Sequence, residues 1–214
     1  HTITQFNATI DQPMSVGLSS TTQTIKKTNT HTHITATWSH PISTMALTLH
    51  PSFTKLKTTK DNTTFTLLYH PNVPSKHAQK ILDYTTASYK YYTTKHGPLP
   101  YKNIVVSQST VRNIFGMAAN GHILLGNSLF NPSVKEELSI VNRVHHFIVA
   151  HEIAHLWSGM QQNFLDSNPL SEGFTNYLTF DYMDHTYGIN ALQVDEKETA
   201  ILKSQVTHKL DMVN

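Results

Sequence analysis

The stretch HEIAHLW, from His151 to Trp157, decides how the rest of the sequence is interpreted. On a helix, residues four apart differ by about 40° around the axis, so the imidazoles of His151 and His155 point the same way and can hold one metal ion. Glu152 lies about 100° from His151, which places its carboxylate beside the ion. The neighbours Ile153 and Ala154 are apolar, and a dry setting strengthens the electrostatic effect of an ion. The stretch therefore predicts a helix that carries a metal site.

A third ligand candidate follows a short loop. The segment LSEGFTNYLTF (170–180) carries Glu172 near the start of its own predicted helix. Two antiparallel helices would return Glu172 to His151 and His155. A His, His, Glu set leaves a fourth position open, which is typical of catalytic zinc, so we expect Zn²⁺ as the cofactor. Two alternatives stay open: incidental helix histidines, and a Glu172 that is favoured only by the helix dipole.

The motifs resemble those of a known family. HEIAHLWSG followed by LSEGFTNY is similar to the zinc-binding region of the membrane alanyl aminopeptidase family, the aminopeptidase N-like gluzincins, which have HExxHxWFG and then WLNEGFA. Other segments resemble parts of that family in the same order. They are SHPISTMALTL (39–49), HGPLPYKNIVV (96–106) and FGMAANGHILLG (115–126). The resemblance covers residues 30 to 190.

The resemblance implies an α+β fold. We expect a thermolysin-like zinc peptidase catalytic domain, with a small mixed sheet and helices that carry HExxH, over residues 57–214. Part of a β-rich domain would precede it over residues 1–56. The family's oxyanion-stabilising tyrosine would lie beyond the last residue, so we expect the chain to be a piece of a longer protein, truncated at its C-terminal end.

The resemblance also implies an activity and a site. We expect a zinc-dependent metallopeptidase that hydrolyses peptide bonds with a zinc-activated water. His151, His155 and Glu172 would bind zinc, and Glu152 would be the general base that passes the proton to the leaving amine. A strand around 119–125 would be the edge strand along the substrate backbone. The substrate-binding residues would be Ala118, Ala119, Asn120 and Gly121.

The chain departs from the family pattern at several positions. Ala119 stands where the family has the glutamate that binds the free amino terminus of its substrate, and an alanine cannot bind an ammonium group. Ser171 replaces an asparagine, and the spacing from His155 to Glu172 is slightly shorter. We therefore expect hydrolysis without the usual amino-terminal requirement. The alternative is a zinc-binding, catalytically weak domain that binds peptides or protein segments.

Periodicity and turn residues give a coarse map of the elements. Residues 1 to about 70 read as strands, with segments at 32–38, 43–49 and 63–70. A helix is predicted over 75–96, stopped by Gly97-Pro98, and strands over 102–108 and 121–130. Further helices are expected from Pro132 through the HExxH motif, from Ser171 to Tyr187, and from Ala191 onward. Trp157 is assigned to packing.

Composition excludes several classes of protein. The 214 residues contain no cysteine, which removes thiol catalysis, disulfides and thiolate metal sites. The net charge of +2 gives no reason to expect nucleic acid as a partner, so the expected partner is a peptide or protein substrate. The low content of charged residues and the sequons at Asn7 and Asn62 favour an extracellular or cell-surface location, within a larger membrane-anchored protein, although the cytoplasm stays open.

Overall fold

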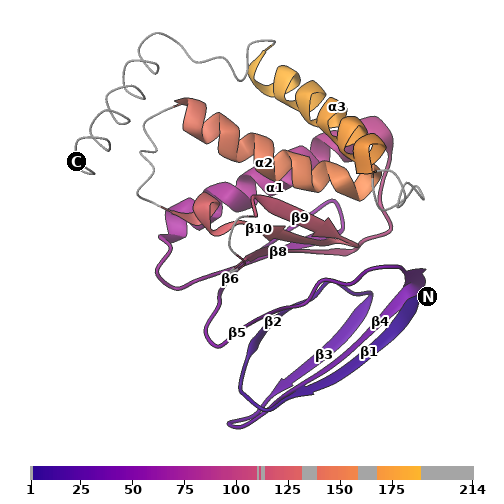
Figure 1. The fold of residues 1–214 in the computed structure, drawn as a ribbon, viewed down its shortest axis with the longest axis vertical. Helices are drawn as coiled ribbons and strands as arrows, with labels where there is room; N and C mark the ends of the chain where they lie inside the picture. Colours follow the sequence, from indigo (N-terminus) through magenta and orange to yellow (C-terminus); the bar gives the residue numbers. More distant parts are fainter. Residues whose placement is uncertain (1, 110, 112–113, 132–138, 159–167, 189–214) are drawn as a thin grey trace.

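The computed structural model describes residues 2–109, 111, 114–131, 139–158 and 168–188. Within them the fold is a mixed α+β arrangement, as the sequence predicts, with three long helices on one side of a five-stranded sheet and smaller antiparallel sheets on the other (Figure 1). The expected helix from Ala191 and the expected helix start at Pro132 lie outside the described residues. None of the described helices is both long and apolar enough to cross a membrane.

The five-stranded sheet is the platform of the molecule. Its order is β6-β7-β8-β10-β9, where β8 pairs in parallel with β7 and β10, and both outer strands are antiparallel to their neighbours. The strands are β6 (Thr54–Lys60), β7 (Thr63–Tyr69), β8 (Asn103–Gln108), β9 (Gly116–Ala119) and β10 (His122–Leu125). The turn between β6 and β7 uses Asp61 and Asn62 with positive φ, as a tight hairpin requires.

Two expectations about this sheet are wrong. The predicted strand over 121–130 ends at Leu125, because residues Asn127–Phe130 form a short 3-10 helix whose Leu129 and Phe130 enter the core. The predicted edge strand around 119–125 is not at the edge, because β10 lies between β8 and β9, and β9 is the outer strand.

The predicted domain boundary at residues 56 and 57 falls inside β6, and the domain division stays a prediction.

Three helices cover one face of the sheet (Figure 1). They are α1 (Ser75–His96), α2 (Ser139–Ser158) and α3 (Asn168–Tyr187), where α1 and α2 contact the sheet and α3 packs mainly on α2. The predicted end of α1 is confirmed, because Gly97 has φ +89° and its N–H bonds to Thr93. The main core joins alternate residues of the strands to the apolar faces of the helices.

The first third of the chain is all β. β1 (Ile3–Ile10), β4 (Thr32–Ile42) and β3 (Thr22–Lys27) form one antiparallel sheet, and β2 (Ser15–Gly17) pairs with β5 (Thr48–His50). Of the predicted strand over 43–49, only its last two residues belong to β5. This part lies against the sheet face opposite the helices, since a Cβ added to Gly17 would meet Leu68, Ser107 and His122, which alternate with core residues.

Candidate metal centre

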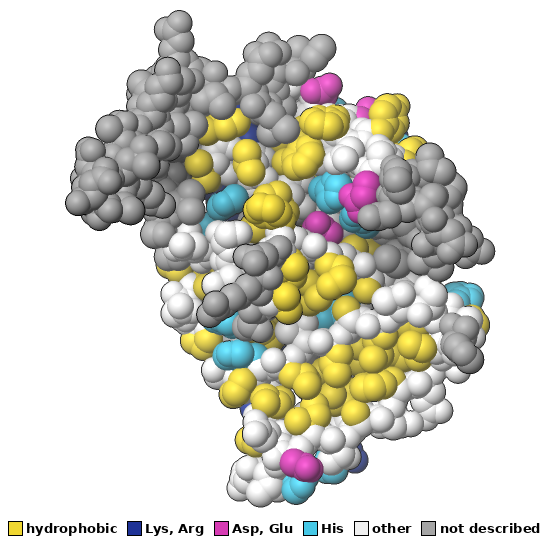
Figure 2. All heavy atoms as spheres, viewed as in Figure 1, with side chains coloured by type: hydrophobic (Ala, Val, Ile, Leu, Met, Phe, Trp, Pro, Cys, Tyr) yellow, Lys and Arg dark blue, Asp and Glu magenta, His cyan; other side chains and the backbone are white. Residues whose placement is uncertain are grey.

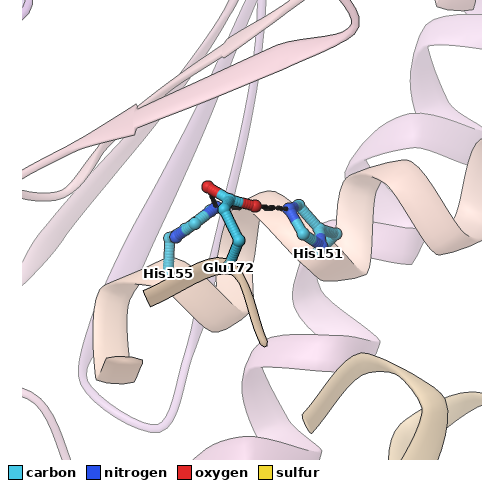
Figure 3. A group of neighbouring side chains, drawn as sticks. All are labelled: His151, His155 and Glu172. Atoms are coloured by element: carbon cyan, nitrogen blue, oxygen red, sulfur yellow. Dashed lines mark hydrogen bonds and ion pairs between the residues drawn. The ribbon is translucent and has the colours of Figure 1, made fainter. Parts of the chain in front are cut away.

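The structure brings the three predicted metal ligands together (Figure 3). His151 and His155 stand one turn apart on α2, and Glu172 comes from the first part of α3. The Nε2 atoms of the two histidines are 3.2 Å apart. One carboxylate oxygen of Glu172 is 3.3 Å from Nε2 of His151, and the other is 3.4 Å from Nε2 of His155. Two imidazole nitrogens and the two oxygens of one carboxylate therefore converge from two helices.

These separations fit a zinc ion. Zinc binds nitrogen and oxygen ligands at about 2.0–2.2 Å, and tetrahedral geometry then places ligand atoms about 3.3–3.6 Å from one another. The Nε2–Nε2 separation and the separation of each Nε2 from its nearer Glu172 oxygen lie at or within about 0.1 Å of that range, with a different oxygen facing each histidine. The donor set of two imidazoles and one carboxylate is also one that zinc accepts.

The tautomer of His155 follows from its partners. Thr175 donates its hydroxyl proton to the carbonyl of Ser171, so its oxygen is left to accept a bond from Nδ1–H of His155, 3.1 Å away. Nε2 of His155 then carries a bare lone pair, which points at Glu172 and His151. Thr175 is fully buried, and Ser158 also contacts its hydroxyl. A hydrogen bond of this kind orients a metal-binding histidine and fixes its tautomer.

His151 is less completely bonded. Its Nδ1 is buried and has no hydrogen-bond partner among the described residues. Its Nε2 faces the carboxylate of Glu172 and the bare Nε2 of His155, so it can donate a proton to them, or bind a metal in the tautomer whose proton is on Nδ1. A cation placed there would be attracted by all three groups, and this observation on the described side chains fits a metal better than an empty cluster.

Burial keeps the two imidazoles neutral, which is the form that binds a metal. Burial and the neighbouring His151 together lower the pKa of His155 to about 4, against the opposite influence of Glu172. Burial also lowers the pKa of His151, against the opposite influence of Glu172 and Asn176. Glu172 itself is about half exposed, so the centre has one open side.

Glu152 lies beside the centre, on the side of the sheet. Its side chain is buried, and burial together with the negative charge of Glu172 raises its pKa to about 8. A Cβ added to Gly116 of β9 would overlap the Glu152 carboxyl group, so the edge strand lies directly on this side chain. Only glycine allows that approach without displacing Glu152. The carboxyl group is therefore held between α2 and β9.

The predicted substrate-binding residues lie farther along β9. Ala118 packs against the main core, and Ala119 is buried as the last residue of β9. Asn120 and Gly121 form the turn into β10, with positive φ at both. The side chain of Asn120 donates to the carbonyl of Thr44 and accepts from Tyr101. The backbone edge of β9 that faces away from β10 has no strand partner among the described residues. The roles of these four residues stay predictions.

Sequence reasoning missed two side chains that shape the centre. Thr175 stands one turn after Glu172 in the same predicted helix, and this spacing is the signal that could have suggested it. Gly116 is the first residue of GMAAN, and its contact with Glu152 depends on the position of β9, which the sequence does not reveal. Trp157 is confirmed as a packing residue, since its ring lies against Tyr89 and Tyr92 and its N–H bonds to Gly97.

Comparisons with known proteins add no identification. No family model matches the chain, and no curated protein matches it.

Proposed function

We propose that the protein is a zinc-dependent metallopeptidase with a thermolysin-like catalytic domain, related in mechanism to the aminopeptidase N-like gluzincins. The observation that carries the proposal is the convergence of His151, His155 and Glu172 at separations that suit zinc ligands, with a buried Glu152 beside them. The mixed sheet, whose antiparallel outer strand β9 contacts the helix α2 that carries the HExxH motif, also supports the proposal. The expected substrate is a peptide or protein, and the expected location is the outer face of a membrane.

The proposed chemistry divides between the ion and the chain. Zinc bound by His151, His155 and Glu172 would supply Lewis acidity toward a water molecule and the scissile carbonyl oxygen. Glu152 would accept the proton of the attacking water at its carboxylate and then donate it to the nitrogen of the leaving amine. Gly116 holds the Glu152 side chain in place through its contact, and Thr175 orients His155. The free edge of β9 offers backbone groups for an extended peptide.

The raised pKa of Glu152 is consistent with this role. A general base works best with a pKa near the operating pH, and a buried carboxyl group with a pKa of about 8 in the ion-free protein is in that region. A divalent cation beside it would favour the carboxylate form and lower this value. Glu152 would therefore be ionised near neutral pH when the ligands are occupied.

Metal analysis combined with three variants tests the proposal. We expect about one zinc per chain, lost in both His151→Ala and His155→Ala. Glu152→Gln should keep the zinc, while cleavage of a peptide library falls by about 10²–10⁴-fold. The exposed His33 on β4 provides a control, because His33→Ala should change neither quantity. Zinc that stays bound after both ligand changes would refute the assignment of the site.

One observation favours a second candidate, a zinc-binding domain that binds peptides without cutting them. The residues of β9, Gly116 to Ala119, offer no acidic side chain for the amino terminus of a substrate. In this case the wild-type protein would bind zinc and peptides, and Glu152→Gln would change neither. Measurable cleavage that depends on Glu152 separates the two candidates.

A further inference from the structure

An apolar surface continues from the metal centre along the two helices. It consists of Val144 and Phe147 on α2 and Phe180 on α3, and we call it the apolar shelf. Val144 is 41% exposed and Phe180 is 50% exposed, whereas Phe147 is partly buried against the main core. Figure 2 shows hydrophobic side chains beside a group of histidine and acidic side chains on the helical half of the molecule. Exposed apolar groups gathered next to a reactive centre favour a binding role over chance.

Helix periodicity places the shelf on the metal-binding face. Val144 lies seven residues before His151 and Phe147 lies four before it, so both follow the same stripe of α2 toward its N-terminal end. The ring centroids of Phe147 and His151 are 6.1 Å apart and nearly parallel. The shelf therefore begins about one helical turn, roughly 5.4 Å, from the nearest metal ligand.

α3 supplies the outer part of the shelf. It runs antiparallel to α2, since Glu172 near its start meets His155, and Phe180 farther on meets Phe147 at a centroid distance of 5.3 Å. Glu172 and Phe180 are eight residues apart, about 80° around the axis, and each contacts α2. The ligand carboxylate and the aromatic ring therefore both lie on the side of α3 that contacts α2.

Glu152 and the shelf lie on opposite sides of the histidine pair. Glu152 contacts the edge strand through Gly116, whereas Phe147 contacts α3 through Phe180. A peptide that pairs with the free edge of β9 would present its scissile bond to the histidines. A side chain next to that bond, on the face of the peptide toward α3, would then reach the shelf, because side chains of an extended strand alternate between its faces.

We propose that the apolar shelf selects substrates with a large apolar or aromatic side chain next to the cleaved bond. This inference rests on the proposed peptidase function and names its substrate class. Val144, Phe147 and Phe180 offer no charge or hydrogen-bond donor to that side chain, so acidic and amide side chains would lose their hydration there without compensation. A ring or a branched aliphatic chain would instead bury apolar area against the half-exposed Phe180.

Cleavage of a peptide library by the zinc-loaded protein tests the preference. Peptides blocked at both ends are digested, and the cut sites are read by mass spectrometry. We expect Phe, Tyr, Leu or Met to be enriched at one position flanking the cut. Two peptides that differ only by Phe or Ala at that position are then compared. Phe180→Ala should lower kcat/KM for the Phe peptide about 10-fold and for the Ala peptide less than about twofold.

Phe174→Ala is the matched control. Phe174 is on the same helix and is 42% exposed, but it lies about 200° around the axis from Glu172 and its ring stacks on Tyr177. We expect this variant to keep the ratio of the two kcat/KM values. Cleavage without enrichment, or an unchanged ratio in Phe180→Ala, would overturn the inference while leaving the peptidase proposal standing.

If the wild-type protein cuts no peptide, that result refutes the peptidase proposal but does not test the apolar shelf. A binding measurement then tests the shelf. Zinc-loaded Glu152→Gln protein is titrated with fluorescent versions of the same two blocked peptides. Tighter binding of the Phe peptide, reduced to the level of the Ala peptide by Phe180→Ala and not by Phe174→Ala, supports the shelf. Equal binding of both peptides overturns it.

Discussion

At the scale of single residues, the geometry of the candidate centre depends on neighbouring residues that orient His155 and Glu152. The hydroxyl of Thr175 donates to Ser171 and accepts from His155, which leaves the free lone pair of His155 directed at the site. Gly116 restricts the position of Glu152, because the absence of a side chain at residue 116 lets the backbone of β9 pack directly against the Glu152 carboxyl group. Neither residue is a ligand or a base, yet both fix the direction of one.

Thr175→Val should weaken zinc binding by about 10–100-fold while the helices stay folded, because the bond that orients His155 is lost and the shape of the side chain is kept. The measurement is competition for zinc with a chromophoric chelator. Thr179→Val is the control, since Thr179 is equally buried but bonds to the backbone oxygen of Thr175 and to Tyr92, and not to a candidate ligand. Equal affinities for the two variants would remove the orienting role.

The candidate ligand residues could be predicted from the sequence, whereas the residues that contact and orient them could not. The spacing of His151 and His155 fixes a common helical face whatever surrounds the helix, and Glu172 follows from the antiparallel return of the next helix. The contact between Thr175 and His155 depends on how α3 is rotated against α2. The packing of many side chains sets that rotation, and no short pattern encodes it.

At the scale of elements, β9 is the strand that the sequence described least well. Its four residues, GMAA, contain no β-branched side chain, so local propensity does not predict a strand. Pairing with β10 and contact with α2 make it one. The strand over 63–70 and the helix over 75–96 were easier to predict, because their hydrophobic periodicity and the Gly97 stop are local signals.

The composition of β9 leads to a prediction about substrate ends. A free ammonium group gains nothing from Ala118 or Ala119, so peptides with acetylated and free amino termini should be cleaved with kcat/KM values within about threefold of each other. The measurement uses one peptide sequence in both forms with zinc-loaded protein. A preference of about 100-fold for the free amine would mean that another acidic side chain binds it.

At the scale of the whole molecule, one buried histidine joins the two halves. His122 of β10 is fully buried, and its Nδ1–H donates to the carbonyl of Ala46. Its Nε2 then accepts from the hydroxyl of Ser107, 2.8 Å away, with Thr48 at 3.3 Å. The five-stranded sheet and the β-rich front part therefore share a side chain that needs to stay neutral.

The stability of the metal-free protein should decrease as the pH falls from 6.5 toward 4. Burial lowers the pKa of His122 to about 4, so in this window the unfolded chain binds a proton that the folded chain does not. His122→Asn should lower the free energy of unfolding at pH 7. It should also reduce the slope of that free energy against pH by up to about 1.4 kcal/mol per pH unit. Urea unfolding at several pH values measures both, and an unreduced slope would contradict the prediction.

The origin of the three donors has a mechanical consequence. Two of them belong to α2 and the third belongs to α3, so an ion bound by all three would cross-link the two helices. Removing the ion with a chelator should then speed amide hydrogen exchange in α3 more than in α1, because α1 packs on the sheet and carries none of the three side chains. Substrate turnover and the docking of a helix would in this way draw on the same three side chains.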